Sequence, residues 1–234
     1  MPHKHAKALD VMSCAKNYNY WIFRKIKPYI GSSVLEIGCG IGNFTEFLTD
    51  LEGLTCLDMI EECITRSKLK FHKHNNIKYI HGDFLDKTIL SEVSEAGYDT
   101  IICLNVLEHI EKDRDALKKM FSLLKKGGNL ILIVPALWQI YGSLDQSLGH
   151  IKRYNKKPLS QLLACAGFKN TYLEYFNSIG ILGWYINGRI LKRKEMSLAQ
   201  ALIYDKLFIP VIAKIESFVS PPFGMSLLAI SRKE

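Results

Sequence analysis

A short glycine-rich segment, Val34 to Phe44, constrains the fold of this chain more than any other feature. It reads Val-Leu-Glu-Ile-Gly-Cys-Gly-Ile-Gly-Asn-Phe. Its apolar start is typical of a buried parallel strand, three glycines follow at alternate positions, and the next residues have helical spacing. Glycine lets the backbone turn sharply and approach a ligand closely, and a helix start offers unpaired N–H groups. The segment therefore predicts a strand, a ligand-binding turn and a helix.

An acidic residue inside this segment narrows the class of ligand. Dinucleotide-binding turns follow the pattern G-x-G-x-x-G. This chain instead has G-x-G-x-G, with Glu36 two residues before Gly38. A carboxylate there disfavours a pyrophosphate and suits a cationic ligand. The segment resembles the first motif, E-x-G-x-G-x-G, of the class I S-adenosylmethionine-dependent methyltransferases; a plain tight turn in an α/β protein is the alternative.

The resemblance continues through residue 135 and implies a set of cofactor contacts. The apolar run from Leu54 ends in Asp58, about twenty residues after the glycines, where such folds bind ribose hydroxyls. Gly82-Asp83-Phe84 resembles the family's adenine-binding turn, in which the acid accepts the amino group and the next N–H contacts a ring nitrogen. The cofactor implied is S-adenosyl-L-methionine, and the implied contacts are Glu36, Gly38, Cys39, Gly40, Gly42, Asp58, Met59, Asp83, Phe84 and Asn105.

The same resemblance implies one α/β domain over residues 1–234. The expected fold is a doubly wound, Rossmann-like, seven-stranded and mostly parallel sheet with an antiparallel last strand. We expect a helix over residues 113–126 and the fifth strand over 129–135. The expected parts are an N-terminal helical cap (1–31), a cofactor-binding half (32–135), a substrate loop, helix and strand (136–176), a helical insert (177–223) and the last strand (224–234).

Candidates for a general base lie after the fourth and fifth strands. Residues 136–154 form a long polar and aromatic loop, and loops of this length in compact domains are often functional. His150 in this loop is a candidate base, because histidine titrates near neutral pH, and Arg153 could bind an anionic group on the substrate. His109 is the competing base and Tyr154 a third catalytic candidate. The alternative is that His150 and Tyr154 only hold the loop.

Two subgroup resemblances bear on the substrate. The run from Val106 to Ile110 resembles the small-molecule branch of the family, and the Gly-His-x-x-Arg-Tyr cluster at 149–154 resembles methyltransferases of glycan and polyprenol-linked systems. The expected reaction is therefore O-methylation of a small-molecule or lipid- or glycan-linked acceptor. A nucleic-acid or protein methyltransferase and a nicotinamide-dependent oxidoreductase are the alternatives. The [D/N/S]-P-P-[Y/F/W] motif of base-methylating enzymes is absent after the fourth strand.

Charge and composition limit the classes of partner. The net charge is +8, but the lysines are spread along the chain, which disfavours nucleic acid as a partner. No metal is expected, because the six cysteines show no C-x-x-C pair or zinc spacing. Met1 to Asp10 does not read as a signal peptide and no apolar run reaches membrane-spanning length, so a cytoplasmic location is expected. The basic, apolar insert 177–223 suggests a substrate lid, a peripheral membrane contact or a homodimer face.

Overall fold

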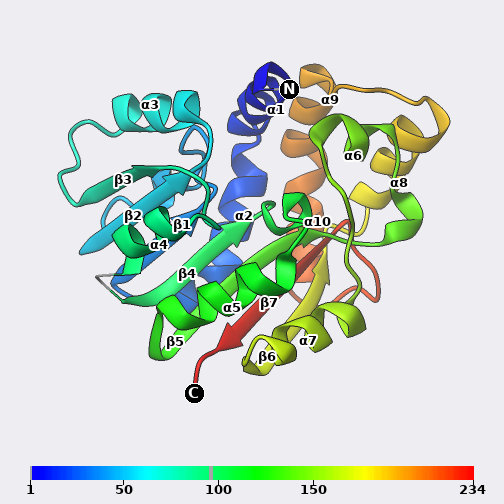
Figure 1. The fold of residues 1–234 in the computed structure, drawn as a ribbon. Helices are drawn as coiled ribbons and strands as arrows, with labels where there is room; N and C mark the ends of the chain where they lie inside the picture. The colour runs from blue at the N-terminus through cyan, green and yellow to red at the C-terminus, as the bar shows by residue number, and fades with distance from the viewer. Residues whose placement is uncertain (1, 95–96) are drawn as a thin grey trace.

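The structure is a computed structural model that describes residues 2–94 and 97–234, and its strands form a seven-stranded sheet (Figure 1). The strand order is β3-β2-β1-β4-β5-β7-β6, and β7 runs antiparallel to both of its neighbours. The predicted mostly parallel sheet with an antiparallel last strand is therefore confirmed. The strands are β1 (Ser33–Ile37), β2 (Gly53–Asp58), β3 (Ile77–His81), β4 (Tyr98–Leu104), β5 (Leu124–Pro135), β6 (Lys169–Phe176) and β7 (Ser226–Arg232).

Helices pack on both faces of this sheet, and shorter turns connect them to the strands (Figure 1). The α-helices are α1 (Pro2–Ser13), α2 (Lys16–Ile26), α3 (Glu61–Lys70), α4 (Lys87–Ser94), α5 (Asp113–Leu123), α6 (Ser143–Leu148), α7 (Lys156–Cys165), α8 (Gly180–Tyr185), α9 (Leu198–Ile203) and α10 (Ile209–Glu216). The 3-10 turns are η1 (Lys27–Tyr29), η2 (Thr45–Phe47), η3 (Leu107–His109) and η4 (Trp138–Ile140), and the π-helical turns are η5 (Ile186–Ile190) and η6 (Tyr204–Phe208).

The sheet separates two hydrophobic cores, because successive side chains of a strand point to opposite faces. In β5, Leu130 and Leu132 belong to the core that includes α5 and α7, whereas Ile131 and Ile133 belong to the core that includes α2 and α10. These four side chains are at most 1% exposed. A strand buried on both faces reads as a continuous apolar run, which is why β5 is recognisable in the sequence.

Two expected element boundaries are wrong. No α-helix follows the glycine turn: only the 3-10 turn η2 forms, and Phe47 stacks on Phe23 with ring centroids 4.9 Å apart. The helix expected over 113–126 ends at Leu123, because Leu124 pairs with Tyr98 in β4. Strand β5 therefore begins at Leu124, five residues before the expected start at Asn129. In both places a contact with a distant part of the chain overrides the local pattern.

The insert between β6 and β7 packs beside the N-terminal helices, with α9 alongside α1 and α10 alongside α2 (Figure 1). One buried acid attaches it to α2, and a second joins the start of the insert to its end. The Asp205 carboxylate accepts hydrogen bonds from the backbone N–H groups of Asn17 and Tyr18, at 3.2 and 2.8 Å. The Glu216 carboxylate accepts from the backbone N–H groups of Asn177 and Ser178, both at 2.9 Å.

Candidate functional site

The glycine turn after β1 lies at the carboxyl end of the sheet. Gly38, Gly40 and Gly42 have φ angles of +75°, +54° and +81°, which favour glycine. A Cβ atom on Gly38 would lie 2.2 Å from Cγ2 of Val106, the residue that follows Asn105 after β4. The turn and the end of β4 are thus in direct contact, so a larger residue at position 38 would push them apart.

Two of the predicted cofactor acids follow neighbouring strands and share this edge. Asp58 ends β2 and its carboxylate accepts hydrogen bonds from the N–H groups of Gly40 and Ile60, at 2.8 and 2.9 Å. Asp83 follows β3, and its Oδ1 accepts from the N–H of Leu85 at 2.8 Å. Since β2 pairs with β3 in parallel, both acids lie at the same edge of the sheet, and Asp58 contacts the glycine turn. These two hydrogen-bond acceptors fit the hydroxyl groups of a ribose and the amino group of an adenine ring.

Two side chains next to these acids differ sharply in exposure. The Phe84 side chain is only 4% exposed and packs in the core, so its predicted contact can come only from the backbone N–H. Met59, directly after Asp58, is 69% exposed. Its thioether side chain is therefore available to an aromatic ring bound at this edge.

Glu36 lies in the interior below the glycine turn. It is 3% exposed, and its Oε2 accepts a hydrogen bond from the Thr45 hydroxyl at 2.7 Å and lies 3.6 Å from the Cys56 thiol. Burial raises the pKa of Glu36 to about 7. A cationic ligand group nearby would offset the cost of ionising this carboxyl group, as the sequence prediction requires.

The turn is covered by α1, which the sequence did not place there. The Asn43 side-chain amide donates to the Leu9 carbonyl at 2.9 Å, and a Cβ atom on Gly40 would lie 3.2 Å from the Leu9 side chain. The cap predicted over 1–31 therefore consists of two helices, of which α1 reaches the cofactor edge. The polar composition of its first residues gave no signal for this role.

A cavity of about 200 Å³ opens beside the ends of β4 and β5. It brings together four residues that the sequence singled out separately: Asn105, His109, His150 and Arg153. The remaining wall is largely apolar and includes Leu9, Pro135, Leu148, Trp184, Met196 and Met225. Trp184 and Met196 belong to the segment between β6 and β7, so the insert forms part of the wall. A small, largely apolar acceptor suits this cavity.

His150 is oriented by a buried carboxylate. Its Nδ1 lies 3.0 Å from Oδ1 of Asp145, which also accepts from Nε of Arg153 at 2.8 Å. Oδ2 of Asp145 accepts from the indole N–H of Trp184 at 3.0 Å. Burial alone would raise the pKa of Asp145, but these hydrogen bonds and the charge of Arg153 hold it below its ordinary value. The ionised carboxylate directs the other nitrogen of His150, Nε2, away from it.

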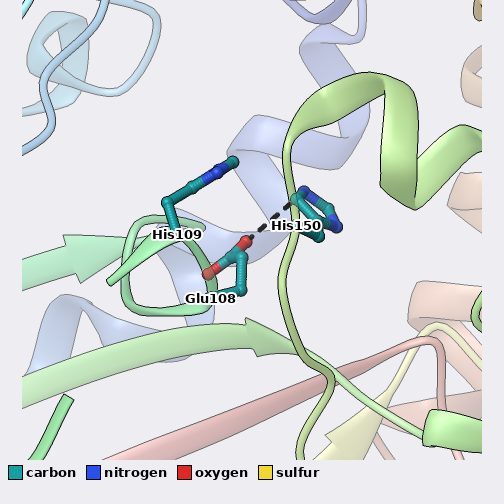
Figure 2. A group of neighbouring side chains, drawn as sticks. All are labelled: Glu108, His109 and His150. Atoms are coloured by element: carbon teal, nitrogen blue, oxygen red, sulfur yellow. Dashed lines mark ion pairs between the residues drawn. The ribbon is translucent and has the colours of Figure 1, made fainter. Parts of the chain in front are cut away.

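A third acid, Glu108, lies beside the two histidines and was not among the predicted site residues. Its carboxylate is fully buried, and Oε1 is 3.8 Å from Nε2 of His150 (Figure 2). The rings of His109 and His150 lie edge to face with centroids 5.0 Å apart. The adjacent Glu-His pair after the fourth strand was the available signal, but the sequence did not show that His150 would meet it.

Two other predicted residues have structural partners. The Tyr154 hydroxyl donates to the Leu107 carbonyl and to Asp113, at 3.2 and 3.0 Å, and its side chain is not part of the cavity wall. Arg153 donates to Asp145 and, through Nη1, to the Ala136 carbonyl at 2.6 Å. The forked contact with an anionic substrate expected for Arg153 is therefore unavailable to these two nitrogens. These contacts of both side chains hold the loop, and Arg153 also lines the cavity.

Comparison with known proteins bears on the family of this chain. The family described as a methyltransferase domain matches residues 15–173. A mitochondrial ubiquinone biosynthesis O-methyltransferase of Schizosaccharomyces pombe is 29% identical over 47% of this chain and 40% of its own length. A probable S-adenosylmethionine-dependent methyltransferase of Mycolicibacterium smegmatis is 24% identical over 70% of this chain and 65% of its own length. The chain thus spans less than two thirds of either relative.

A solved structure agrees with the fold. The S-adenosylmethionine-dependent methyltransferase from Archaeoglobus fulgidus has a TM-score of 0.60 at 21% identity, and the match covers 90% of this chain and 91% of that one. At this identity the likeness concerns the fold alone. The family match over residues 15–173, the confirmed strand order and the glycine turn with its acids together lead to one conclusion. The chain belongs to the class I S-adenosylmethionine-dependent methyltransferase family.

Proposed function

We propose that this chain transfers the methyl group of S-adenosylmethionine to an oxygen atom of a small, largely apolar acceptor. The observation that carries the proposal is the cavity at the ends of β4 and β5, where Asn105, His109 and His150 meet an apolar wall. This wall adjoins the glycine turn through Leu9, which lines the cavity and contacts Gly40. A cofactor on the turn and an acceptor in the cavity would therefore be neighbours.

Separate residues of the chain would bind the cofactor and take up the proton of the acceptor. When bound, the cofactor supplies an activated methyl group on a sulfonium ion. Asp58 would accept hydrogen bonds from the ribose hydroxyls, Asp83 and the Phe84 N–H would bind the adenine, and Glu36 would stabilise the cationic amino group. The main demand on the protein is then to hold acceptor and methyl group in line. His150, held by Asp145, is the proposed base for the acceptor hydroxyl.

The names of the relatives favour oxygen as the acceptor atom. The Schizosaccharomyces pombe relative and one from Rickettsia bellii, 30% identical over 48% of this chain, are both named ubiquinone biosynthesis O-methyltransferases. A phenolic ring carrying a lipid tail would match a cavity with a polar side and an apolar wall. The test is a transfer assay with methyl-labelled cofactor and phenol, quinol, sugar and lipid-linked acceptors; labelling of sugars alone would contradict the proposal.

Replacing Asp58 with alanine should weaken S-adenosylmethionine binding by about 1–3 kcal/mol, because hydrogen bonds to a charged group are lost. Isothermal titration calorimetry with the cofactor measures this change directly. Asp50→Ala is a matched control, since this acid lies in the exposed loop before β2. Equal affinities of the Asp58 variant and the unmodified chain would show that the ribose does not bind at the end of β2.

We also propose that the insert rests on an anionic membrane surface, where an apolar acceptor would be available. Ile203, Leu207, Val211 and Ile215 recur every four residues along α9, η6 and α10, and each side chain is more than half exposed. The opposite side of these helices, with Ile209 and Ile212, is buried. An outward apolar stripe is the arrangement of an interfacial helix.

The charges of the insert match such a surface. Six exposed cations lie between residues 177 and 223: Arg189, Lys192, Arg193, Lys194, Lys206 and Lys214. Of the acids there, Asp205 and Glu216 are buried and Glu195 is paired with Lys7. The exposed charge is therefore predominantly positive, which favours anionic lipid. Among the described residues, no helix is long and apolar enough to cross a bilayer.

Co-sedimentation with vesicles of phosphatidylcholine and phosphatidylglycerol should therefore show binding that requires the anionic lipid and falls as salt rises. The pair Leu207→Glu and Val211→Glu should abolish it, because both side chains lie on the exposed stripe. Leu69→Glu, an equally exposed leucine on α3, is the control. Failure of the unmodified chain to bind at low salt would reject the membrane contact and leave a substrate lid or a homodimer face, the second of which sedimentation velocity would detect.

A further inference from the structure

Glu108, His109 and His150 form a group of potential metal ligands at the wall of the cavity (Figure 2). One nitrogen or oxygen atom from each residue lies within 4.8 Å of the others, and Nε2 of His150 is 3.8 Å from Oε1 of Glu108. Tetrahedral zinc sites place neighbouring donors roughly 3.3–3.5 Å apart, given bonds of about 2.0–2.1 Å. Small side-chain rotations would bring these atoms to that spacing.

Glu108 is an unusual residue to find buried. Its side chain is 0% exposed, and neither carboxylate oxygen has a hydrogen-bond partner among the described residues. A buried carboxyl group left in this state costs free energy unless something binds it. The carboxylate is directed toward Nε2 of His150 at a distance too long for a hydrogen bond (Figure 2). The space between these two atoms is where a missing partner would lie.

Each histidine of the group already has a carboxylate or a backbone carbonyl next to its Nδ1 nitrogen. Histidine ligands in metal sites commonly donate their other ring N–H to a carboxylate or a backbone carbonyl. Nδ1 of His150 bonds to Asp145, and Nδ1 of His109 lies 3.1 Å from the Gly149 carbonyl. The Asp145 carboxylate is itself held by Arg153 and Trp184. The Asp145 carboxylate fixes Nδ1 of His150, so Nε2 of this ring is the nitrogen that faces Glu108.

We propose that Glu108, His109 and His150 bind one divalent first-row transition-metal cation at the wall of the acceptor cavity. Two imidazoles and one carboxylate suit Zn²⁺, Mn²⁺, Fe²⁺ or Co²⁺ better than Mg²⁺ or Ca²⁺, which prefer oxygen ligands. Three protein ligands leave a coordination position open, as in catalytic sites. This inference rests on the proposed function for its role: a cation there would bind an acceptor oxygen and lower the pKa of its hydroxyl group. With the cation bound, Nε2 of His150 would be a ligand, and the cation would replace His150 as the group that promotes loss of the acceptor proton.

The test uses the full chain without a histidine tag, treated with chelator and then freed of it. Titration with Co²⁺ should produce visible d–d absorption that saturates at one ion per chain, and Zn²⁺ should displace it. Glu108→Gln, His109→Gln and His150→Gln should each weaken Co²⁺ binding on the order of 100-fold. Saturable binding that survives all three substitutions, or the lack of one-to-one binding by the unmodified chain, would overturn the site.

Controls separate this site from other histidines and from the proposed function. His72→Gln and His74→Gln, at two histidines that follow α3 and do not line the cavity, should bind Co²⁺ normally. Thermal unfolding and cofactor calorimetry report whether each variant is folded. A chain that binds S-adenosylmethionine but no metal ion refutes the cation site alone. A chain that binds the metal ion but not the cofactor refutes the proposed function and leaves the site standing.

Discussion

The His150→Gln variant is expected to lose roughly 10²–10⁴-fold in turnover while its affinity for S-adenosylmethionine stays unchanged. His150 lines the acceptor cavity, and Asp145 holds its ring by a 3.0 Å contact to Nδ1. Glutamine preserves the size and polarity of the side chain but can neither take up a proton near neutral pH nor replace an imidazole as a strong ligand. Single-turnover kinetics with an acceptor found in the screen, together with cofactor calorimetry, measures both quantities.

The matched variants are His109→Gln, in the same cavity, and His72→Gln, outside it. Full turnover in His150→Gln together with a large loss in His109→Gln would transfer the role of base to His109. Full turnover in both would mean that positioning of the two substrates carries the reaction without a base. Restoration of His150→Gln by excess Mn²⁺ or Zn²⁺ would identify the histidine as a ligand, because added cation cannot replace a proton acceptor.

Glu36→Gln is expected to stabilise the cofactor-free protein at pH 8 by about 3 kcal/mol and to weaken cofactor binding. The folded-state pKa of Glu36 is raised from 4.5 to about 7, so the folded protein keeps a proton that the unfolded chain has lost. The free energy of unfolding therefore falls as pH rises from 4.5 to 7, at about 1.4 kcal/mol per pH unit. Glutamine removes this loss because it does not ionise.

Chemical denaturation at several pH values between 4.5 and 8 tests the expectation through the difference between the two proteins. The difference should be near zero at pH 4.5, grow up to about pH 7 and then level off. Cofactor affinity should change in the opposite sense: the unmodified chain should bind more tightly above pH 7, where Glu36 is ionised next to the cationic amino group, and the variant should lack this rise.

Glu46→Gln is the matched control, since this glutamate lies in η2 but is exposed and paired with Lys70. Its effect on stability should be at most about 1 kcal/mol and should lack the rise between pH 4.5 and 7. A Glu36 variant whose stability tracks that of the unmodified chain across this pH range would show that Glu36 is already ionised in the folded protein.

The sequence by itself determined the sheet and the place of the cofactor edge. Strands such as β5, buried on both faces, must be apolar throughout, and this pattern is visible without coordinates. Asp58 and Asp83 follow neighbouring strands, and parallel strands end at the same edge, so their proximity follows from topology. The glycines at 38, 40 and 42 marked the turn because side chains are disfavoured at their positive φ angles.

Only the tertiary structure decided what surrounds that edge. No periodicity encodes the path of the loop that carries His150 to Glu108, or the contacts by which Asp145 gathers His150, Arg153 and Trp184. Spacing alone also could not show that the stripe from Ile203 to Ile215 faces outward, because a helical pattern tells which residues share a face but not what the face meets. These features depend on contacts between segments far apart in the chain, and such contacts leave no local signal.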